Sequence, residues 1–311
     1  MKYFQMPSGS TMPGFGLGTW KSDPGVVGAA VKTAIEQIGY RHIDCAAIYG
    51  NEKEIGTALK SVFDGGVVKR EDVFLTSKLW NSNHAKDAVE PALKQTLADL
   101  QVDYLDLYLM HWPVATSEDG SMVSLDEFPL VETWRAMEAC REKGLCKDIG
   151  VSNFSKKKLQ ELCEQASIKP AVNQIELHPY LQMKDVLKYG EEQGIHFTAY
   201  SPLGSKDRPA SLKNDDEKPI LEDPVIGEIA KKNQVSPAQI LIAWALGRGT
   251  SVIPKSVSPE RLKQNMEASD LTLKPGDMEA ISKLDKHARY VDGSFWCLEG
   301  SPYTLETLWD E

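Results

Sequence analysis

Eight strand-like segments alternate with amphipathic helical segments along this chain, and this alternation limits the fold more than any other feature of the sequence. A clear helix follows residue 86, where Val89, Leu93, Leu97 and Leu100 recur at helical spacing. Strands joined by helices form parallel sheets with helices outside, which predicts an α/β protein. Eight such units predict a closed (β/α)8 TIM barrel, with an open doubly wound sheet as the alternative. The expected strands are centred on residues 14–18, 42–44, 73–78, 104–110, 148–151, 171–176, 196–200 and 250–254.

Segments outside these units complete the predicted architecture. Residues 2–5 and 11–12 flank a Pro-Ser-Gly-Ser turn, which predicts an N-terminal β-hairpin that would plug one end of the barrel. Long loops at residues 113–128 and 203–222 follow the fourth and seventh strands, so they should lie above the C-terminal face. The charged run in the second loop either covers a ligand or is simply solvated. Four helices should begin at a capping residue followed by proline, at Asp23-Pro24, Asp223-Pro224, Ser236-Pro237 and Ser258-Pro259.

Composition narrows the class of protein. The formal charge of −10, from 35 basic and 45 acidic residues, argues against a general nucleic-acid surface. No apolar run approaches the roughly 20 residues that span a bilayer, and the N-terminal MKYFQMPSGS lacks the apolar core of a secretion signal. The five cysteines include no CxxC pair, so neither a disulfide framework nor a metal site is expected. We therefore expect a cytoplasmic protein, a monomer or weak dimer, with reduced thiols and no membrane partner.

No interdomain linker interrupts the sequence. We expect residues 1–311 to form a single domain, with residues 291–311 as a C-terminal tail that carries aromatic side chains without helical periodicity.

Polar side chains follow three neighbouring strands. Asp44 and Tyr49 lie where the sequence changes from strand to helix periodicity, and the next two strands end in Lys78 and in His111. Adjacent parallel strands deliver such residues to one rim, where barrels keep their active sites. Taken singly, each residue has a structural explanation as a cap, a packed ring, an ion pair or a core histidine. A lysine at the end of a buried strand is costly without a carboxylate partner, which favours one shared site.

A phosphate site is expected in the last βα unit. Residues 14–20 invite comparison with G-x-G-x-x-G, but Thr19 replaces the third glycine and Trp20 would crowd a pyrophosphate. Lys255-Ser256-Val257 instead precedes a helix start that carries Arg261, Gln264 and Asn265, a set that suits an anion. The alternative is a basic helix start that faces solvent.

Taken in order, these motifs resemble those of the aldo-keto reductase family over essentially the whole chain. The matching segments are residues 14–20, Arg41-His42-Ile43-Asp44, Tyr49-Gly50-Asn51-Glu52, Ser77-Lys78-Leu79-Trp80, His111-Trp112-Pro113, Gly150-Val151-Ser152-Asn153-Phe154, Asn173-Gln174-Ile175-Glu176, Tyr200-Ser201-Pro202-Leu203-Gly204 and Ile253-Pro254-Lys255-Ser256.

The resemblance implies that Asp44, Tyr49, Lys78 and His111 are the catalytic residues of an NADPH-dependent reductase of aldehydes, aldoses or some ketones. Hydride transfer to a carbonyl leaves an alkoxide, and a tyrosine with a pKa near ~10 can protonate it. Lys78 would lower the pKa of Tyr49, Asp44 would hold Lys78, and His111 would orient the carbonyl. A glutamate at position 111, as in the family's steroid double-bond reductases, would suggest reduction of an enone instead.

The resemblance also implies the cofactor contacts. Ser152, Asn153 and Gln174 would bind the nicotinamide carboxamide, Tyr200 would stack on the ring, and the last βα unit would bind the 2′-phosphate of NADPH. NADH would bind more weakly, and Gln264 stands where many relatives have glutamate. The full expected set is Thr19, Trp20, Ser152, Asn153, Gln174, Tyr200, Ser201, Leu203, Ser205, Lys255, Ser256, Val257, Arg261, Gln264 and Asn265.

Aromatic side chains are expected to form the substrate pocket, a composition that suits apolar aldehydes and sugar faces alike. The implied residues are Trp20, Trp80, Trp112, Phe295, Trp296 and Cys297. Two other functions fit the same sequence. The barrel would keep its cofactor but act as a binding or structural subunit, or it would oxidise alcohols or polyols with NAD(P).

Overall fold

Eight parallel strands form the central sheet of this computed structural model, which describes residues 1–206, 208–210, 213 and 218–311. The strands follow one another in the order β12-β11-β10-β9-β6-β5-β4-β3. They are β3 Leu17–Gly18, β4 His42–Asp44, β5 Phe74–Leu79, β6 Leu105–Met110, β9 Cys146–Ser152, β10 Val172–Glu176, β11 His196–Tyr200 and β12 Ser251–Val252. All residues of β5 and β6 are buried, as expected for strands covered on both faces.

Contacts between the first and last segments close the sheet. The Gly16 amide donates to the Val252 carbonyl at 2.9 Å, and the Val252 amide donates to the Gly14 carbonyl at 2.8 Å. A further parallel bridge joins Gly18 to Lys255, and a Cβ at Gly18 would lie 2.7 Å from the Ile253 carbonyl oxygen. Glycine permits this close approach. The predicted (β/α)8 barrel is therefore confirmed, and the open sheet is excluded.

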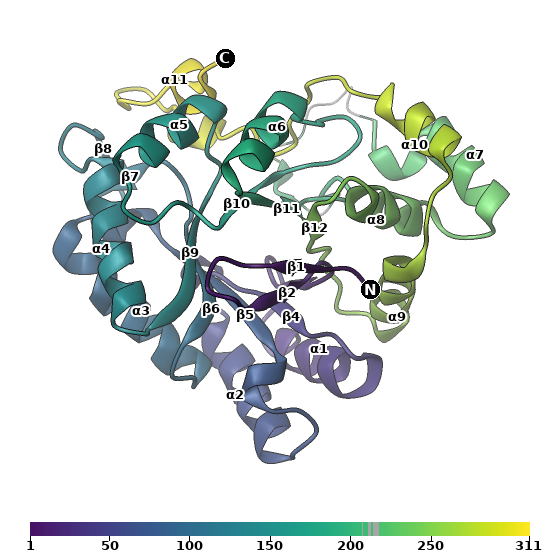
Figure 1. Ribbon diagram of the computed structural model, residues 1–311, viewed down its shortest axis with the longest axis horizontal. Coiled ribbons are helices and arrows are strands. Elements are labelled where there is room, and N and C mark those ends of the chain that lie inside the picture. Colours follow the sequence, from purple (N-terminus) through teal and green to yellow (C-terminus); the bar gives the residue numbers. More distant parts are fainter. Residues whose placement is uncertain (207, 211–212, 214–217) are drawn as a thin grey trace.

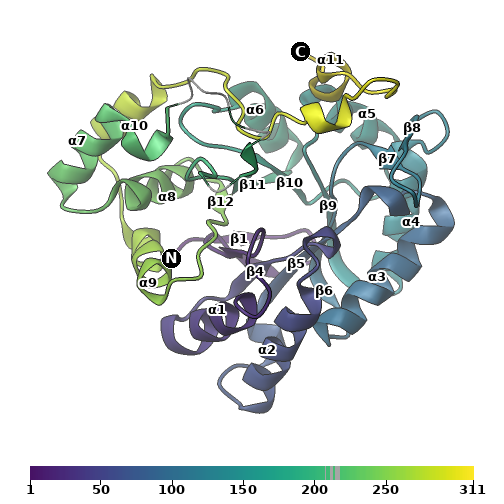
Figure 2. The ribbon, with the colours of Figure 1, turned by 180° about the vertical axis from the view of Figure 1, so that it is seen from behind.

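Helices surround the barrel on its outside (Figure 1; Figure 2). The α-helices are α1 Val27–Thr33, α2 Glu52–Asp64, α3 Lys86–Leu100, α4 Leu130–Glu142, α5 Lys156–Gln165, α6 Lys184–Gln193, α7 Pro224–Asn233, α8 Pro237–Gly247, α9 Pro259–Glu267, α10 Pro275–Ser282 and α11 Leu305–Trp309. A π-helical turn, η1 Ala34–Ile38, continues α1, and the 3-10 turns are η2 Ala47–Tyr49, η3 Arg70–Asp72, η4 Asn81–Asn83, η6 Ile220–Glu222, η7 Ala268–Asp270 and η8 Ser294–Trp296. Among the described residues, no helix has the length and apolarity required to cross a bilayer.

Helix starts test the capping prediction. Asp223, Ser236 and Ser258 each accept a backbone N–H hydrogen bond at the start of a helix that has proline in its first turn. The fourth prediction is wrong, because α1 begins at Val27 rather than after Asp23-Pro24. There the Asp23 carbonyl closes a turn with the Val26 amide instead.

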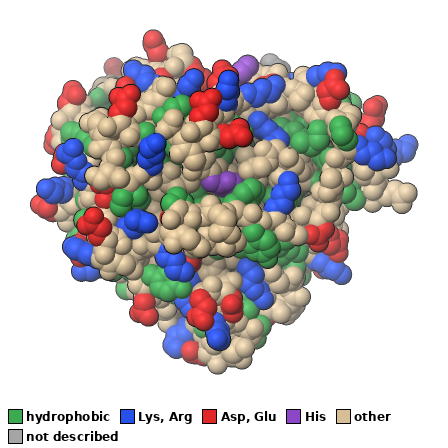
Figure 3. Space-filling model, viewed as in Figure 1, with side chains coloured by type: hydrophobic (Ala, Val, Ile, Leu, Met, Phe, Trp, Pro, Cys, Tyr) green, Lys and Arg blue, Asp and Glu red, His purple; other side chains and the backbone are tan. Residues whose placement is uncertain are grey.

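The N-terminal hairpin covers one end of the barrel, as predicted. Strands β1 Tyr3–Gln5 and β2 Thr11–Pro13 pair antiparallel and cross that end of the molecule (Figure 1). Met6 and Met12 pack with Phe74, Leu107 and Val172 from the barrel. Basic and acidic side chains are intermixed over this face (Figure 3). The opposite, C-terminal face is thus the end that remains for a site.

The long connections lie where the strand order predicts. The loop after β6 forms a small hairpin from β7 Ala115–Thr116 and β8 Met122–Val123. In the loop after β11, residues 207, 211, 212 and 214–217 lie outside the described residues, so the prediction for its charged run stays a prediction. The tail, expected to lack helical structure, contains η8 and the short helix α11.

Candidate active site

A buried ion pair joins the ends of β4 and β5. The Lys78 ammonium lies 2.6 Å from Asp44 Oδ1, and the two side chains are 1% and 2% exposed. Lys78 also donates to the Cys45 carbonyl at 2.8 Å and to the Tyr49 hydroxyl at 3.4 Å. Burial lowers the pKa of Lys78, but the charges of Asp44 and Tyr49 outweigh burial and raise the pKa above its usual value. Lys78 therefore stays charged at the base of the site.

Tyr49 reaches this pair from a tight turn. It ends η2, and Gly50 follows in the left-handed conformation with φ of 67°. Burial raises the pKa of the Tyr49 phenol, and Lys78 opposes that rise without overcoming it. The phenol therefore keeps its proton at neutral pH, with a cation in place to stabilise the phenolate when the proton leaves.

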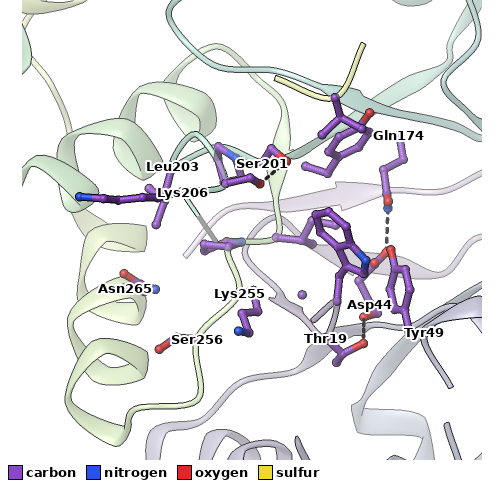
Figure 4. Close-up of a pocket in the computed structure, with 18 of the residues that line it drawn as sticks. Thr19, Asp44, Tyr49, Gln174, Ser201, Leu203, Lys206, Lys255, Ser256 and Asn265 are labelled. Carbon is purple, nitrogen blue, oxygen red and sulfur yellow. Dashed lines mark hydrogen bonds between the residues drawn. The ribbon is translucent and has the colours of Figure 1, made fainter. Parts of the chain in front are cut away.

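Two other elements hold Asp44. Gln174 Nε2, on β10, donates to Asp44 Oδ2 at 2.7 Å, and Thr19 Oγ1 donates to the Asp44 carbonyl at 2.8 Å. Both hydrogen bonds are visible in Figure 4. The carboxylate is thereby fixed on both oxygens, one by Lys78 and one by Gln174. The contact between Gln174 and Asp44 was not anticipated from the sequence, because 130 residues separate the two side chains.

His111 lies beside Tyr49 at the end of β6. Their ring centroids are 5.9 Å apart, and the Trp80 ring lies 5.2 Å from that of His111. Burial first, and then the positive charge of Lys78, hold the pKa of His111 well below its usual value. The imidazole is thus neutral at physiological pH and has one N–H to donate.

One cavity of about 1020 Å³ runs from these residues to the start of α9. Asp44, Tyr49 and Gln174 lie at one end, while Ser256 and Asn265 lie at the other (Figure 4). The cavity combines an aromatic end with a basic and hydroxyl-rich end. Such a volume suits a ligand larger than a single sugar or aldehyde.

Comparisons with known proteins decide the family. The model of the "Aldo/keto reductase family" matches residues 13–286. An aldo/keto reductase of Synechocystis is 56% identical over 318 residues, which cover 100% of this chain and 97% of that relative. The human and rat proteins named "Aldo-keto reductase family 1 member A1" are each 49% identical over 294 residues, which cover 91% of this chain and 89% of each relative. The chain belongs to the aldo/keto reductase family. It is therefore an oxidoreductase of a family that acts on carbonyl groups and generally uses a nicotinamide cofactor.

Four residues predicted to contact the nicotinamide of this aldo/keto reductase are joined in one hydrogen-bonded chain, whose central link is the bond of 3.2 Å from Asn153 Nδ2 to Ser152 Oγ. The Tyr200 hydroxyl donates to Asn153 Oδ1 at 2.7 Å, and Asn153 Nδ2 donates to the His111 carbonyl at 2.9 Å. Ser152 Oγ donates to the Gln174 carbonyl at 2.7 Å. Asn153 has φ of 62°, a left-handed conformation that asparagine tolerates better than most residues. These bonds fix the cavity wall between Tyr49 and the loop after β11.

The residues predicted to bind the cofactor phosphates all line the cavity. Ser201 and Ser205 have left-handed φ values of 49° and 42°, and their hydroxyls lie 2.6 Å apart. Ser258 caps α9, so the helix start faces the same space. The lining includes Ser201, Leu203, Ser205, Lys255, Ser256, Val257, Arg261, Gln264 and Asn265.

Five of the six predicted substrate-pocket residues also line the cavity: Trp20, Trp80, Trp112, Phe295 and Trp296. The sixth, Cys297, does not, since its thiol is directed to the Gly293 carbonyl at 3.7 Å. Burial and Asp292 raise the pKa of this thiol. Cys297 packs against the aromatic cluster that includes Trp112 and Trp296, and its assignment to the substrate pocket stays a prediction.

Sequence reasoning missed several lining residues. Ile48 and Val291 line the cavity. Ile48 immediately precedes Tyr49, and Val291 is the first residue of the predicted tail, so these positions were the available signal. Lys206 and the start of α8 at Ser236 and Pro237 also line it. The Ser236-Pro237 pattern predicted a helix start but not its place at the cavity, and no local pattern marks Lys206. Among the described residues, no group of three histidine, cysteine or acidic side chains could hold a metal ion.

Proposed function

We propose that this aldo/keto reductase reduces aldehydes or open-chain aldoses, and some ketones, to alcohols with NADPH by direct hydride transfer. The observation that carries the proposal is the contact of 3.4 Å between the Tyr49 hydroxyl and the Lys78 ammonium, beside His111. It supplies a proton donor, a cation that favours loss of the proton, and a neutral N–H donor at one point of the cavity.

The donor set of the cavity fits a phosphorylated dinucleotide. Lys255 and Arg261 are cations, Ser256 has a hydroxyl, and all three lie at the start of α9, an arrangement that suits the 2′-phosphate. Ser201 and Ser205 would bind the pyrophosphate, and the Tyr200 ring would stack on the nicotinamide. NADPH, when bound, supplies the hydride to the carbonyl carbon.

The chain's own residues would control the substrate oxygen. His111 donates its N–H to the carbonyl oxygen and orients it. As negative charge develops on that oxygen, Tyr49 transfers its phenolic proton to it. Lys78 stabilises the phenolate that remains, and Asp44 with Gln174 keeps Lys78 from turning towards the substrate. The aromatic end of the cavity binds the rest of the substrate and excludes water.

NADPH absorbance during reduction of a reactive aromatic aldehyde tests this proposal. Tyr49→Phe should lower kcat by about 10²–10⁴-fold, the usual contribution of a general acid, without changing the Kd for NADPH. Tyr3→Phe is the matched control, because Tyr3 is 57% exposed on the N-terminal hairpin, and it should keep full activity. Equal activity in Tyr49→Phe and wild type would remove the proposed acid. No turnover of a broad carbonyl panel by wild type would favour a binding role.

A further inference from the structure

The turn that follows β5 carries buried polar atoms that have no use in the mechanism above. Asn81 and His84 are 0% and 2% exposed. Within the part of the chain that the structure describes, both side-chain polar atoms of Asn81, both ring nitrogens of His84 and Nδ1 of His111 have no hydrogen-bond partner. A buried polar atom without a hydrogen-bond partner destabilises the fold, so five of them require an explanation.

Strand pairing places the turn that carries Asn81 and His84 beside the end of β6, where His111 follows. β5 pairs with β6 so that Leu79 lies opposite Met110, and the His111 amide donates to the Leu79 carbonyl at 3.1 Å. Trp80, the next residue, has its ring 5.2 Å from that of His111. The 3-10 turn η4 starts at Asn81, and His84 follows it with helical φ and ψ.

Residues three apart in such a turn eclipse one another, so Asn81 and His84 point to the same side. The His84 backbone is fixed there, because Thr133 Oγ1 on α4 donates to its carbonyl at 2.8 Å. Burial lowers the pKa of His84 to about 3, so both it and His111 are neutral at physiological pH.

We propose that Asn81 and His84 bind internal water next to His111 Nδ1, and that this polar cluster keeps the His111 proton on Nε2. Buried water typically makes about three hydrogen bonds to polar groups that otherwise lack partners. A neutral imidazole has one N–H, and a donor to one ring nitrogen places that N–H on the other. Only the tautomer with the proton on Nε2 can donate to a carbonyl if Nδ1 faces the cluster. Asn81 and His84 are thus positioning residues, and the proposal rests on the proposed role of His111.

Nitrogen NMR of the histidine side chains tests the proposal without any substrate. In wild type, His111 should carry its proton on Nε2 and accept a hydrogen bond at Nδ1. In His84→Leu, the fraction of His111 side chains with the proton on Nδ1 should rise. The kcat should then fall about tenfold. This is less than the roughly 10²–10³-fold loss of kcat that follows complete removal of a hydrogen-bond donor to a reacting oxygen. KM and the Kd for NADPH should change little. His84→Gln keeps polar atoms in the cluster and should restore both the tautomer and most of kcat.

His196→Leu is the matched control, since His196 lies at the other end of the barrel, where it contacts Phe4 and Ser251. It should leave the His111 tautomer unchanged. If His84→Leu does not fold, Asn81→Leu provides the same comparison. A wild-type His111 protonated on Nδ1, or a tautomer and kcat that neither Leu variant changes, would overturn the proposal. A tautomer shift in an enzyme that reduces no carbonyl would instead refute the proposed function alone.

Discussion

At the scale of single residues, the ammonium of Lys78 is held by three oxygen atoms: Asp44 Oδ1, the Cys45 carbonyl and the Tyr49 hydroxyl. An ammonium has three protons to donate, so Lys78 is fully occupied. Lys78 does not line the cavity, whereas Tyr49 does. Lys78 therefore influences the substrate only through the phenol.

Lys255 offers the sharpest test of the phosphate end. We predict that Lys255→Met raises the Kd for NADPH about tenfold to a hundredfold, because a hydrogen bond to a charged group contributes about 1.5–3 kcal/mol. The Kd for NADH should change far less, since NADH has no 2′-phosphate. Quenching of intrinsic fluorescence by each cofactor measures both values.

Lys263→Met is the control for this prediction. Lys263 is an exposed cation on the same helix α9 but does not line the cavity. It should affect neither cofactor. Similar losses of NADPH and NADH binding in Lys255→Met would refute the assignment of the 2′-phosphate.

Among the elements, the C-terminal tail is fixed to the barrel at two places. The Tyr303 hydroxyl accepts from the Ala115 amide at 2.9 Å, and Lys158 on α5 lies 2.6 Å from Asp310. Between them, Trp309 packs on Trp112, with ring centroids 6.0 Å apart. The aromatic wall that lines the cavity thus depends on contacts made outside it.

Asp310→Asn should therefore loosen the substrate end of the site. Burial alone would raise the pKa of Asp310, but Lys158 and Ser155 lower it, so the folded tail favours the carboxylate. Loss of this charge removes about 2 kcal/mol of local stability. We predict that KM for a bulky aromatic aldehyde rises about threefold to tenfold. A less stable tail is detached from the barrel in a larger fraction of molecules, and the detached tail does not complete the aromatic wall of the pocket. The Kd for NADPH should not change.

Lys157→Met serves as the matched control for the tail. Lys157 is the neighbouring residue on α5, 63% exposed, and lies 3.6 Å from Asp310. Such exposed pairs contribute little, so KM should stay at the wild-type value. A small aliphatic aldehyde is measured for comparison. If the KM of Asp310→Asn for the bulky aromatic aldehyde is unchanged, the tail does not shape the pocket.

The elements that sequence could predict are those whose signal is local. β4 and β11 have the predicted bounds, because each is a short, largely buried strand whose residue types and length can be read from the sequence itself. β3 and β12 are shorter than expected, since irregular bridges replace regular pairing where the barrel closes. α11 has only five residues, too few for a periodic signal, and Trp309 and Asp310 stabilise it through tertiary contacts.

In the candidate site, too, some features could be predicted from local sequence and others could not. Asp44, Tyr49, Lys78 and His111 follow identifiable strands, so their meeting at one rim could be predicted from strand order. The bond from Gln174 to Asp44 crosses the barrel interior, and its register depends on how the whole sheet closes. The position of Cys297 depends on the 3-10 turn η8, which has no signature in the sequence.

For the whole molecule, buried histidines make stability depend on pH. Burial lowers the pKa of His42, His84, His111 and His196, with those of His84 and His196 at about 3. A depressed histidine pKa stabilises the fold above the unfolded value of about 6.5, and that stability is lost as the pH falls. Near pH 5.5, His84, His111 and His196 together therefore bind about three protons in the unfolded chain that they do not bind in the folded chain, and His42 adds to this difference in the same direction.

Glu52 acts in the opposite direction. Burial raises its pKa to about 7, although hydrogen bonds from Ser77 and Thr96 oppose the rise. Its contribution to stability is complete below the unfolded pKa of about 4.5 and is lost as the pH rises through about 7. Near pH 5.5 the folded chain thus binds about one extra proton at Glu52. The net difference from these groups is about two protons, so the free energy of unfolding should fall by about 3 kcal/mol for each pH unit of acidification.

Urea unfolding at several values between pH 5 and 6.5 measures this slope, and two substitutions change it with opposite sign. His196→Gln removes one titrating group that resists protonation, so the slope should fall by about one proton. Glu52→Gln removes the group that prefers the protonated form in the fold, so the slope should rise by about one proton and stability at pH 8 should increase by about 3 kcal/mol. Because neither residue lines the cavity, cofactor binding should be unchanged in both. Equal slopes in wild type and both variants would mean that these groups titrate alike in the folded and unfolded chains, and that burial does not govern their protonation.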